Sequence, residues 1–356
     1  MRPTPDTRVR FRLSGRGYVV GMSDARVAVV TGASAGIGRA TARELGERGY
    51  RVGLLARGPD GLNGAARELE AKGLPALPVP TDVADPDAVE RAAEAVEEEL
   101  GPIDVWINNA VATVFAPFVE MEPDEYRRVV EVSFLGAVWG TRAALRRMLH
   151  RDRGAIVQVG SALAHRAIPL QSAYCASKHG VKGFIESLRC ELMHDGSNVH
   201  LAMVQLPAHN TPQFETQRTR LPRHPQPVPP IYQPEVAARA IVWAAEHRCR
   251  DPFVAGSVYK AVWGGRAVPW LVDRYLARTG YEAQQTDRAV DQARPDNLFA
   301  PVSGDHGAHG PFDDQARRRS VVAWAARNRS GLAAAATLGV ATGALALALG
   351  GRPQLR

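Results

Sequence analysis

The chain has 356 residues, of which 45% are hydrophobic and 23% charged, a composition typical of a globular protein and not of a disordered one. Its formal charge of +7 comes largely from arginines near the two ends, without interleaved aromatic residues, which argues against a nucleic-acid partner. Three separated cysteines, and the lack of a His, Cys, Asp and Glu cluster at ligand spacing, exclude a disulfide framework and predict no metal site.

The first segment, residues 1–21, is rich in arginine and lacks an apolar stretch long enough for a secretory signal. Met22 directly precedes the first apolar run, so translation could start at either Met1 or Met22. We therefore expect residues 1–21 to be an N-terminal extension that is disordered or not translated.

Short Val- and Ile-rich runs alternate with amphipathic stretches over residues 22–256. The stretches predict helices, most clearly at 36–49 and 86–100, where apolar residues recur at helical spacing. Alternation of this kind predicts an α/β domain, a doubly wound parallel Rossmann-like sheet with helices on both faces. The runs predict strands at 27–31, 51–56, 76–80, 103–107, 154–160 and 199–205.

The rest of the chain is less regular. Residues 207–234 are rich in proline and predict either a mobile lid or a rigidly turned loop. Residues 257–329 form a C-terminal extension in which the pattern predicts only a helix near 268–277. The uncharged run 330–351 is long enough to cross a bilayer, and the arginines before it would keep the enzyme domain cytoplasmic, anchored on the membrane. Because alanine and glycine dominate that run, a soluble or surface-lying helix is the alternative.

A glycine-rich turn follows the first predicted strand and directly precedes a helix. Glycine lets the backbone turn tightly and approach a pyrophosphate, while the first amides of the helix present partial positive charge to it. The turn therefore predicts that a dinucleotide is bound by Gly32, Ser34, Ala35, Gly36, Ile37 and Gly38.

Tyr174 and Lys178 are four residues apart and share one face of a predicted helix. An adjacent ammonium favours the ionised phenol, so we expect a lowered pKa at Tyr174 and a role as general acid or base. Ser161 follows the fifth predicted strand and could donate a hydrogen bond to the reacting oxygen. Such a trio suits the interconversion of an alcohol and a carbonyl, with the hydride carried by a nicotinamide.

The end of the second predicted strand indicates which cofactor is preferred. An acidic residue there would bind a ribose 2′-hydroxyl, but the chain has Arg57, which could bind a 2′-phosphate with help from Ser34 or Arg39. NADP(H) is therefore favoured, NAD(H) stays open, and a solvated loop residue is the alternative role for Arg57.

These motifs, in this order, resemble the short-chain dehydrogenase/reductase family over residues 25–256. The resemblance implies that Lys178 also holds the nicotinamide ribose and that Asp82, beside Val83, binds the adenine amino group. It implies a cofactor-side wall from Asn108, Asn109 and Ala110, a small-molecule carbonyl or alcohol substrate, and a homodimer or homotetramer. The matching residues are Thr31-Gly32-x3-Gly36-Ile37-Gly38, Asp82-Val83, Asn108-Asn109-Ala110, Ser161 and Tyr174-x3-Lys178.

Two departures from the family pattern bear on the site. Ser133 stands where the family usually has an asparagine that holds a water in the proton path, so we expect Ser133 to take that role or relay the proton differently. Pro207 and Thr211 are expected at the nicotinamide, although the segment replaces the usual Pro-Gly and brings the threonine one position early. His209 and Asn210 are either substrate contacts or structural residues.

The sequence thus predicts an NADP(H)-dependent oxidoreductase for a secondary alcohol and its ketone or aldehyde, with a lipophilic substrate suggested by the candidate membrane segment. An NADP(H)-binding sensor or scaffold with little turnover is the alternative, motivated by Ser133.

Overall fold

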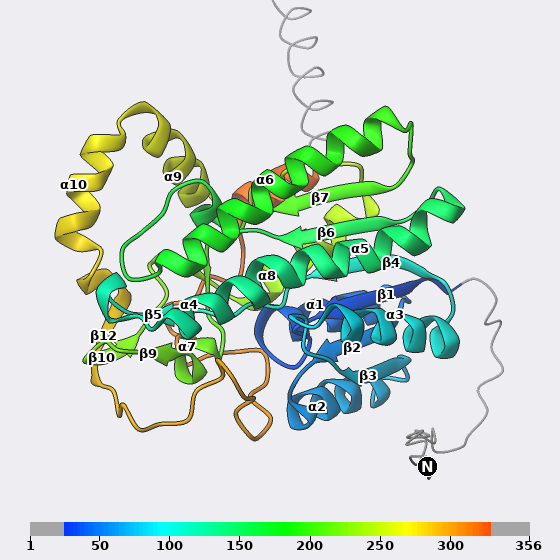
Figure 1. Cartoon of the computed structure of the whole chain (residues 1–356), viewed down its shortest axis with the longest axis horizontal. Coiled ribbons are helices and arrows are strands. Elements are labelled where there is room, and N and C mark those ends of the chain that lie inside the picture. Colours follow the sequence, from blue (N-terminus) through cyan, green and yellow to red (C-terminus); the bar gives the residue numbers. More distant parts are fainter. Residues whose placement is uncertain (1–24, 329–356) are drawn as a thin grey trace, which may run out of the picture.

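A computed structural model describes residues 25–328 of the chain (Figure 1). Its centre is a six-stranded parallel sheet in the order β3-β2-β1-β4-β6-β7, so the strand order reverses direction between β1 and β4. All six predicted strands and the doubly wound Rossmann-like arrangement are confirmed. The strands are β1 Val27–Thr31, β2 Arg51–Ala56, β3 Ala76–Pro80, β4 Ile103–Asn108, β6 Ala155–Val159 and β7 His200–Val204.

Helices cover both faces of this sheet (Figure 1). One face packs against α1 Gly36–Glu47, α2 Pro59–Glu70 and α8 Pro234–Glu246. The other packs against α3 Pro86–Leu100, α4 Pro123–Val130, α5 Gly136–Met148 and α6 Ser172–His194. Because both faces are covered, the strands are apolar runs without polar alternation, and every residue of β1 is buried.

Residues 207–234 form short paired segments, which favours the rigidly turned alternative over the mobile lid. The strand β8 Ala208–His209 pairs with β11 Ile231–Tyr232, β9 Arg218–Thr219 with β5 Val114–Phe115, and β10 Arg223–Pro225 with β12 Gln285–Ala289. Between them lies the helix α7 Gln213–Thr216. Tight helical turns complete the connections: η1 Phe118–Glu120, η2 Glu131–Leu135 (a π-helix), η3 Leu149–Arg151, η4 Ala162–Ala164 and η5 Glu282–Gln284.

The C-terminal extension is more regular than the sequence predicts. The expected helix near 268–277 is α10 Pro269–Thr279, but a second helix, α9 Gly256–Ala267, precedes it, and α11 Val321–Arg327 ends the described part. The prediction of irregular chain over 257–267 was wrong because the glycines of α9 obscure its pattern. Val258 and Val262, one helical turn apart, bury that helix against the domain.

Two predictions fall outside the described residues. The N-terminal extension 1–21 and the candidate membrane segment 330–351 both belong to the parts of the chain beyond residues 25–328. Between those limits, no helix is both long enough and apolar enough to span a bilayer.

The start of α1 lies unusually close to the ends of β1 and β4. A Cβ atom placed on Gly38 would lie 2.1 Å from the carbonyl oxygen of Gly32 and 2.5 Å from the Asn109 side-chain nitrogen. The same Asn109 nitrogen donates to the carbonyl of Thr31 at 2.9 Å, which ties β4 to the turn. Only glycine at position 38 permits this close approach. The approach fixes the position of the glycine-rich turn relative to the ends of β1 and β4.

We therefore predict that Gly38→Ala destabilises the fold, because the new methyl group has to displace backbone atoms and overpacking of this kind costs about 1–3 kcal/mol. The matched control is Gly183→Ala in α6, where an added Cβ meets no atom within 4 Å and alanine favours the helix by up to ~1 kcal/mol. Urea unfolding would measure both free energies. Equal stability of the two variants would contradict the close approach at Gly38.

Candidate active site

A cavity of about 500 Å³ lies at the carboxyl ends of the central strands. This is the position at which doubly wound sheets bind ligands, because the connections diverge where the strand order reverses. Most of the predicted site residues line it together, drawn from six separate connections of the fold. They are Gly32, Ser34, Ala35, Gly36, Ile37, Arg57, Asp82, Val83, Asn109, Ala110, Ser161, Tyr174, Lys178, Pro207 and Thr211.

The glycine turn has the backbone conformation that its sequence requires. Gly32 and Gly36 adopt φ angles of +66° and +57°, in the left-handed region that favours glycine. The space beside Gly36 is closed by Thr211, whose Cγ2 atom would lie 3.2 Å from an added Cβ. The turn and the segment after β7 therefore lie close together, and both line the cavity. The expected contact of Thr211 with the nicotinamide stays a prediction.

The catalytic candidates Ser161, Tyr174 and Lys178 come together on one wall of the cavity. Ser161 caps η4 after β6, while Tyr174 and Lys178 lie one turn apart on α6. The Lys178 Nζ atom donates to the carbonyl of Val159 at 2.8 Å and lies 5.6 Å from the centre of the Tyr174 ring. The four-residue spacing of Tyr174 and Lys178 on α6, together with the position of Ser161 just after β6, thus brings a phenol, an amine and a hydroxyl together.

The expected effect of the ammonium on the phenol was wrong in direction. Burial raises the pKa of Tyr174 to about 12, although a hydrogen bond with Ser161 acts in the opposite direction. Burial also lowers the pKa of Lys178 to about 8, so the amine holds its proton weakly. The loss of hydration around the buried phenol is the largest cause of this shift, so Tyr174 is a protonated phenol at neutral pH.

Gly38, Ser133 and Asn108 were expected at the site but do not line the cavity. Gly38 packs against the Gly32 carbonyl, and the other two are bonded inside the protein. The Ser133 hydroxyl donates to the carbonyl of Ala112 at 2.8 Å and accepts from the Ala112 amide at 2.9 Å, so both of its functions are used inside the protein. Asn108 is buried, where it accepts from the Trp106 indole and donates to Thr141. Ser133 therefore ties the π-helix η2 to the chain after β4, and Asn108 joins β4 to α5 instead of walling the cofactor side.

His209 lines the cavity with one ring nitrogen unused. Its Nδ1 atom lies 2.9 Å from the carbonyl of Pro207, which makes Nδ1 the protonated nitrogen, and its buried Nε2 has no partner within the described residues. Burial lowers the pKa of His209 to about 4, so the ring is neutral and Nε2 is a hydrogen-bond acceptor. Its neighbour Asn210 is structural, since its amide bonds Gln233 and Asp313.

Two arginines, Arg128 and Arg57, bind a carboxylate and several backbone carbonyls at the end of the cavity away from Tyr174. Arg128 pairs with Asp82, and although burial alone would raise the pKa of Asp82, this hydrogen bond and the neighbouring charges lower it overall. Arg57 donates to the carbonyls of Leu298 and Phe299 at 3.1 Å each and also bonds that of Asn297. The predicted 2′-phosphate cation thus lines the cavity while it holds a part of the C-terminal extension.

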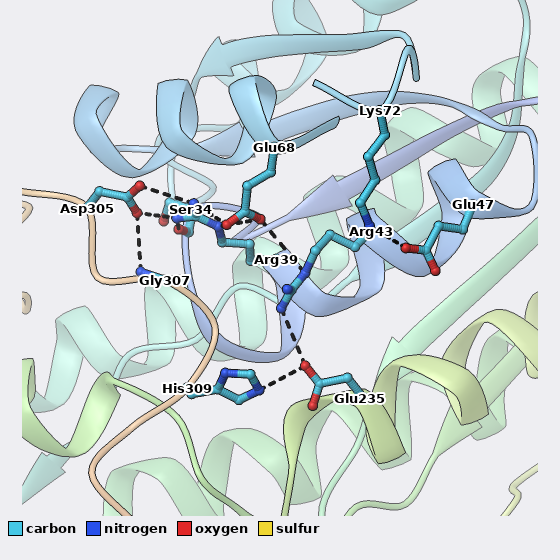
Figure 2. Close-up of polar contacts among 10 residues, drawn as sticks. All are labelled: Ser34, Arg39, Arg43, Glu47, Glu68, Lys72, Glu235, Asp305, Gly307 and His309. Atoms are coloured by element: carbon cyan, nitrogen blue, oxygen red, sulfur yellow. Dashed lines mark hydrogen bonds and ion pairs between the residues drawn. The ribbon is translucent and has the colours of Figure 1, made fainter. Parts of the chain in front are cut away.

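That part of the extension, residues 297–310, crosses the glycine turn and is called the strap below (Figure 1, orange). Asp305 of the strap pairs with Arg39, which is buried and also bound by Glu68 (Figure 2). The carbonyl of Gly307 accepts the amide of Gly36 at 3.1 Å, the first residue of α1. Arg39 is therefore an anchor of the strap and not a free partner for a phosphate.

The sequence motifs did not identify the cavity wall that the extension supplies. The strap contributes Pro301, Val302 and His306, and α10 contributes Leu276. Gln284 accepts from the Gln171 amide at 2.7 Å and so joins the extension to the start of α6. None of these residues belongs to a motif. Contacts between residues more than 100 positions apart in the sequence bring them to the cavity, so no local sequence pattern could have predicted them.

A dinucleotide fits the donor set of this cavity. The glycine turn at one end supplies backbone in the conformation that close phosphate approach requires, Arg57 supplies a cation, and Asp82, Val83 and Ala110 line the wall between. At the other end are Ser161, Tyr174 and Lys178. The chemistry of the lining therefore matches a ligand with an anionic centre and a reactive end beside Tyr174.

Comparisons with known proteins agree with this geometry. A family model described as short chain dehydrogenase matches residues 26–221. The uncharacterized oxidoreductase YxnA of Bacillus subtilis is 33% identical over 79% of this chain and 80% of its own length. Two solved structures are similar: an alcohol dehydrogenase of the archaeon Thermococcus sibiricus complexed with 5-hydroxy-NADP, with 26% identity and TM-score 0.57, and an actinorhodin polyketide ketoreductase with NADPH, with 29% identity and TM-score 0.58. They cover 65% and 66% of this chain, and 96% and 97% of their own chains.

The strap contacts predict that Asp305→Ala frees the segment from α1. Arg39 would keep Glu68 but lose its second partner, and since Asp305 is partly exposed we expect a loss of about 1–2 kcal/mol of unfolding free energy. Hydrogen exchange would show faster exchange at the amides of the strap, with Asp287→Ala, an exposed aspartate of β12, as the control. Unchanged exchange in the Asp305 variant would mean that other contacts hold the strap.

Proposed function

Because the chain belongs to the short-chain dehydrogenase family, we propose that it is an NADP(H)-dependent oxidoreductase that interconverts a secondary alcohol and a ketone or aldehyde. The observation that carries the proposal is the convergence of Tyr174, Ser161 and Lys178 on the cavity that the glycine turn also lines. Tyr174 is the proposed general acid or base.

The cofactor preference rests on charge. Arg57 follows β2 at the position where an acidic residue would favour an unphosphorylated ribose, and the only acidic side chain among the described lining residues, Asp82, is paired with Arg128. The similar solved structures carry 5-hydroxy-NADP and NADPH. These features support NADP(H) as the cofactor, which when bound supplies or accepts the hydride.

Tyr174, Ser161 and Lys178 have separate roles in the proposed reaction. In reduction, the Tyr174 hydroxyl donates its proton to the carbonyl oxygen, and in oxidation the phenolate takes a proton from the alcohol. The Ser161 hydroxyl donates a hydrogen bond to the oxygen where charge develops. Lys178, fixed by its bond to Val159, places a cation beside the phenolate that forms.

The proposed substrate is a lipophilic carbonyl compound. Apolar side chains line the cavity around Tyr174, among them Phe115, Leu163, Ile168, Phe214 and Leu276. A mostly apolar cavity with a few fixed polar groups is typical of a binding site for an uncharged, lipophilic ligand.

A sensor or scaffold with little turnover is the second candidate. It is favoured by Ser133, which is buried, bonded to Ala112 and absent from the cavity lining, and so is poorly placed to hold a water in the proton path. Tight NADPH binding without turnover on a broad carbonyl panel would support it over the enzyme.

We predict that Tyr174→Phe lowers turnover by about 10²–10⁴, because only the proton-transferring hydroxyl is lost. NADPH binding, measured by fluorescence titration, should stay within a fewfold of the parent protein. Tyr126→Phe, a partly buried tyrosine outside the cavity, is the matched control and should keep its turnover. Full activity of Tyr174→Phe would rule out the proposed proton donor.

A second prediction concerns Arg57. In Arg57→Gln, the KM for NADPH should rise about 10- to 100-fold, the cost of one or two charge-assisted hydrogen bonds, while the KM for NADH changes little. If Arg57 only held the strap carbonyls, both constants would rise by the same factor. Equal use of NADH and NADPH by the parent protein would also defeat the proposed preference.

A further inference from the structure

The helices α9 and α10 present exposed aromatic residues to solvent. Trp263, Trp270 and Tyr275 are 62%, 65% and 62% exposed, and Tyr259 is 39% exposed. Soluble surfaces rarely show several large aromatic side chains together, because each leaves apolar area in water. We call these four residues, with the cations described next, the aromatic-basic face.

Four cations belong to the same two helices. They are Lys260, Arg266, Arg274 and Arg278, all exposed, and none has an ion pair within residues 25–328. The single acidic residue of the two helices, Asp273, is already paired with Arg166. On α10 the spacing of Trp270, Arg274 and Arg278 sets them one above another on the same side of the helix. The face is therefore both apolar and strongly positive.

The fold does not need this face for its core. No residue of α10 is buried, although its sequence includes Trp270, Leu271, Val272 and Leu276. Figure 1 shows α9 and α10 at the edge of the molecule, away from the central sheet. Because these apolar residues add nothing to the core, the stability of this chain does not explain their presence. A contact with something outside the chain explains them better.

The same helices form part of the cavity mouth. Tyr275, Leu276 and Thr279 of α10 and Ser257 of α9 line the cavity, as do the proline-rich residues 227–230, and the exposed Tyr275 marks where it reaches the surface. A ligand that enters beside α10 therefore passes the edge of the aromatic-basic face.

We propose that the aromatic-basic face docks on an anionic membrane surface, with the cavity mouth held at the lipid headgroups. Tryptophan and tyrosine favour the boundary between headgroups and acyl chains, because each has an apolar body and a polar tip. Arginine and lysine around them pair with lipid phosphates while their stems cover apolar area. This surface goes beyond the proposed oxidoreductase activity and does not depend on it; only the entry of a lipophilic substrate from the bilayer rests on that activity.

Charge argues against a second copy as the occupant. A symmetric dimer places the same patch on both sides of the interface, so four unpaired cations would meet four more. Like charges brought together in this way cost affinity. An anionic bilayer offers phosphates over its whole area and has no such conflict.

The test compares full-length variants on two kinds of vesicle, phosphatidylcholine alone and a two-to-one mixture of phosphatidylcholine with phosphatidylglycerol. Trp263→Gln/Trp270→Gln removes two aromatics, and Arg274→Gln/Arg278→Gln removes two cations. None of these residues lines the cavity, so reduction of a water-soluble carbonyl without vesicles should be unchanged and reports correct folding. Met193→Gln, which removes an exposed apolar residue at the far end of α6, is the matched control.

We expect the parent protein to sediment with the mixed vesicles and the arginine variant to bind them roughly 30-fold more weakly, about fivefold for each cation. Brominated lipid should quench tryptophan fluorescence of the parent but not of the tryptophan variant. The segment 330–351 is the same in every protein compared, so differences report the face. No binding by the parent, or binding that is equal in all variants, overturns the proposal, as would dimerisation through this face seen by light scattering.

Discussion

The active-site cavity depends on one close contact, the approach of the first turn of α1 to the carbonyl end of β1. Gly38 allows this approach because it has no side chain, and Asn109 fastens it from β4 by bonding the Thr31 carbonyl. The contact opens the glycine turn toward the strand ends, so that the turn and the α6 residues share one space. A bulkier residue at position 38 would push the helix away and move the turn out of line with Tyr174.

Burial has the largest effect on the pKa values of Tyr174 and Lys178 in the active-site cavity. It raises the pKa of the Tyr174 phenol and lowers the pKa of the Lys178 amine, so both groups are brought toward their neutral forms by the same loss of water. At neutral pH the phenol is therefore uncharged, while the amine, with a pKa of about 8, still carries its proton most of the time. A low local dielectric strengthens the hydrogen bonds that Ser161 makes to a bound molecule.

The sequence predicted what depends on local pattern. The strands were found because each is a short apolar run, and Tyr174 with Lys178 because their spacing follows from helix geometry. It could not predict that Ser133 bonds Ala112, since a hydroxyl has many possible partners, nor that burial would raise the pKa of Tyr174. Arg57 was read as a phosphate cation, but its carbonyl partners lie about 240 positions away, and only the folded chain brings them to it.

The strap also has a consequence for how the protein is made. The glycine turn is synthesised within the first tenth or so of the chain, whereas Asp305 and Gly307, which close over it, emerge only after most of the chain has been made. Domains generally fold from the N-terminus while the ribosome is still working. The nascent sheet therefore forms with this end of its cavity open, and the final wall is added as one of the last events of biosynthesis.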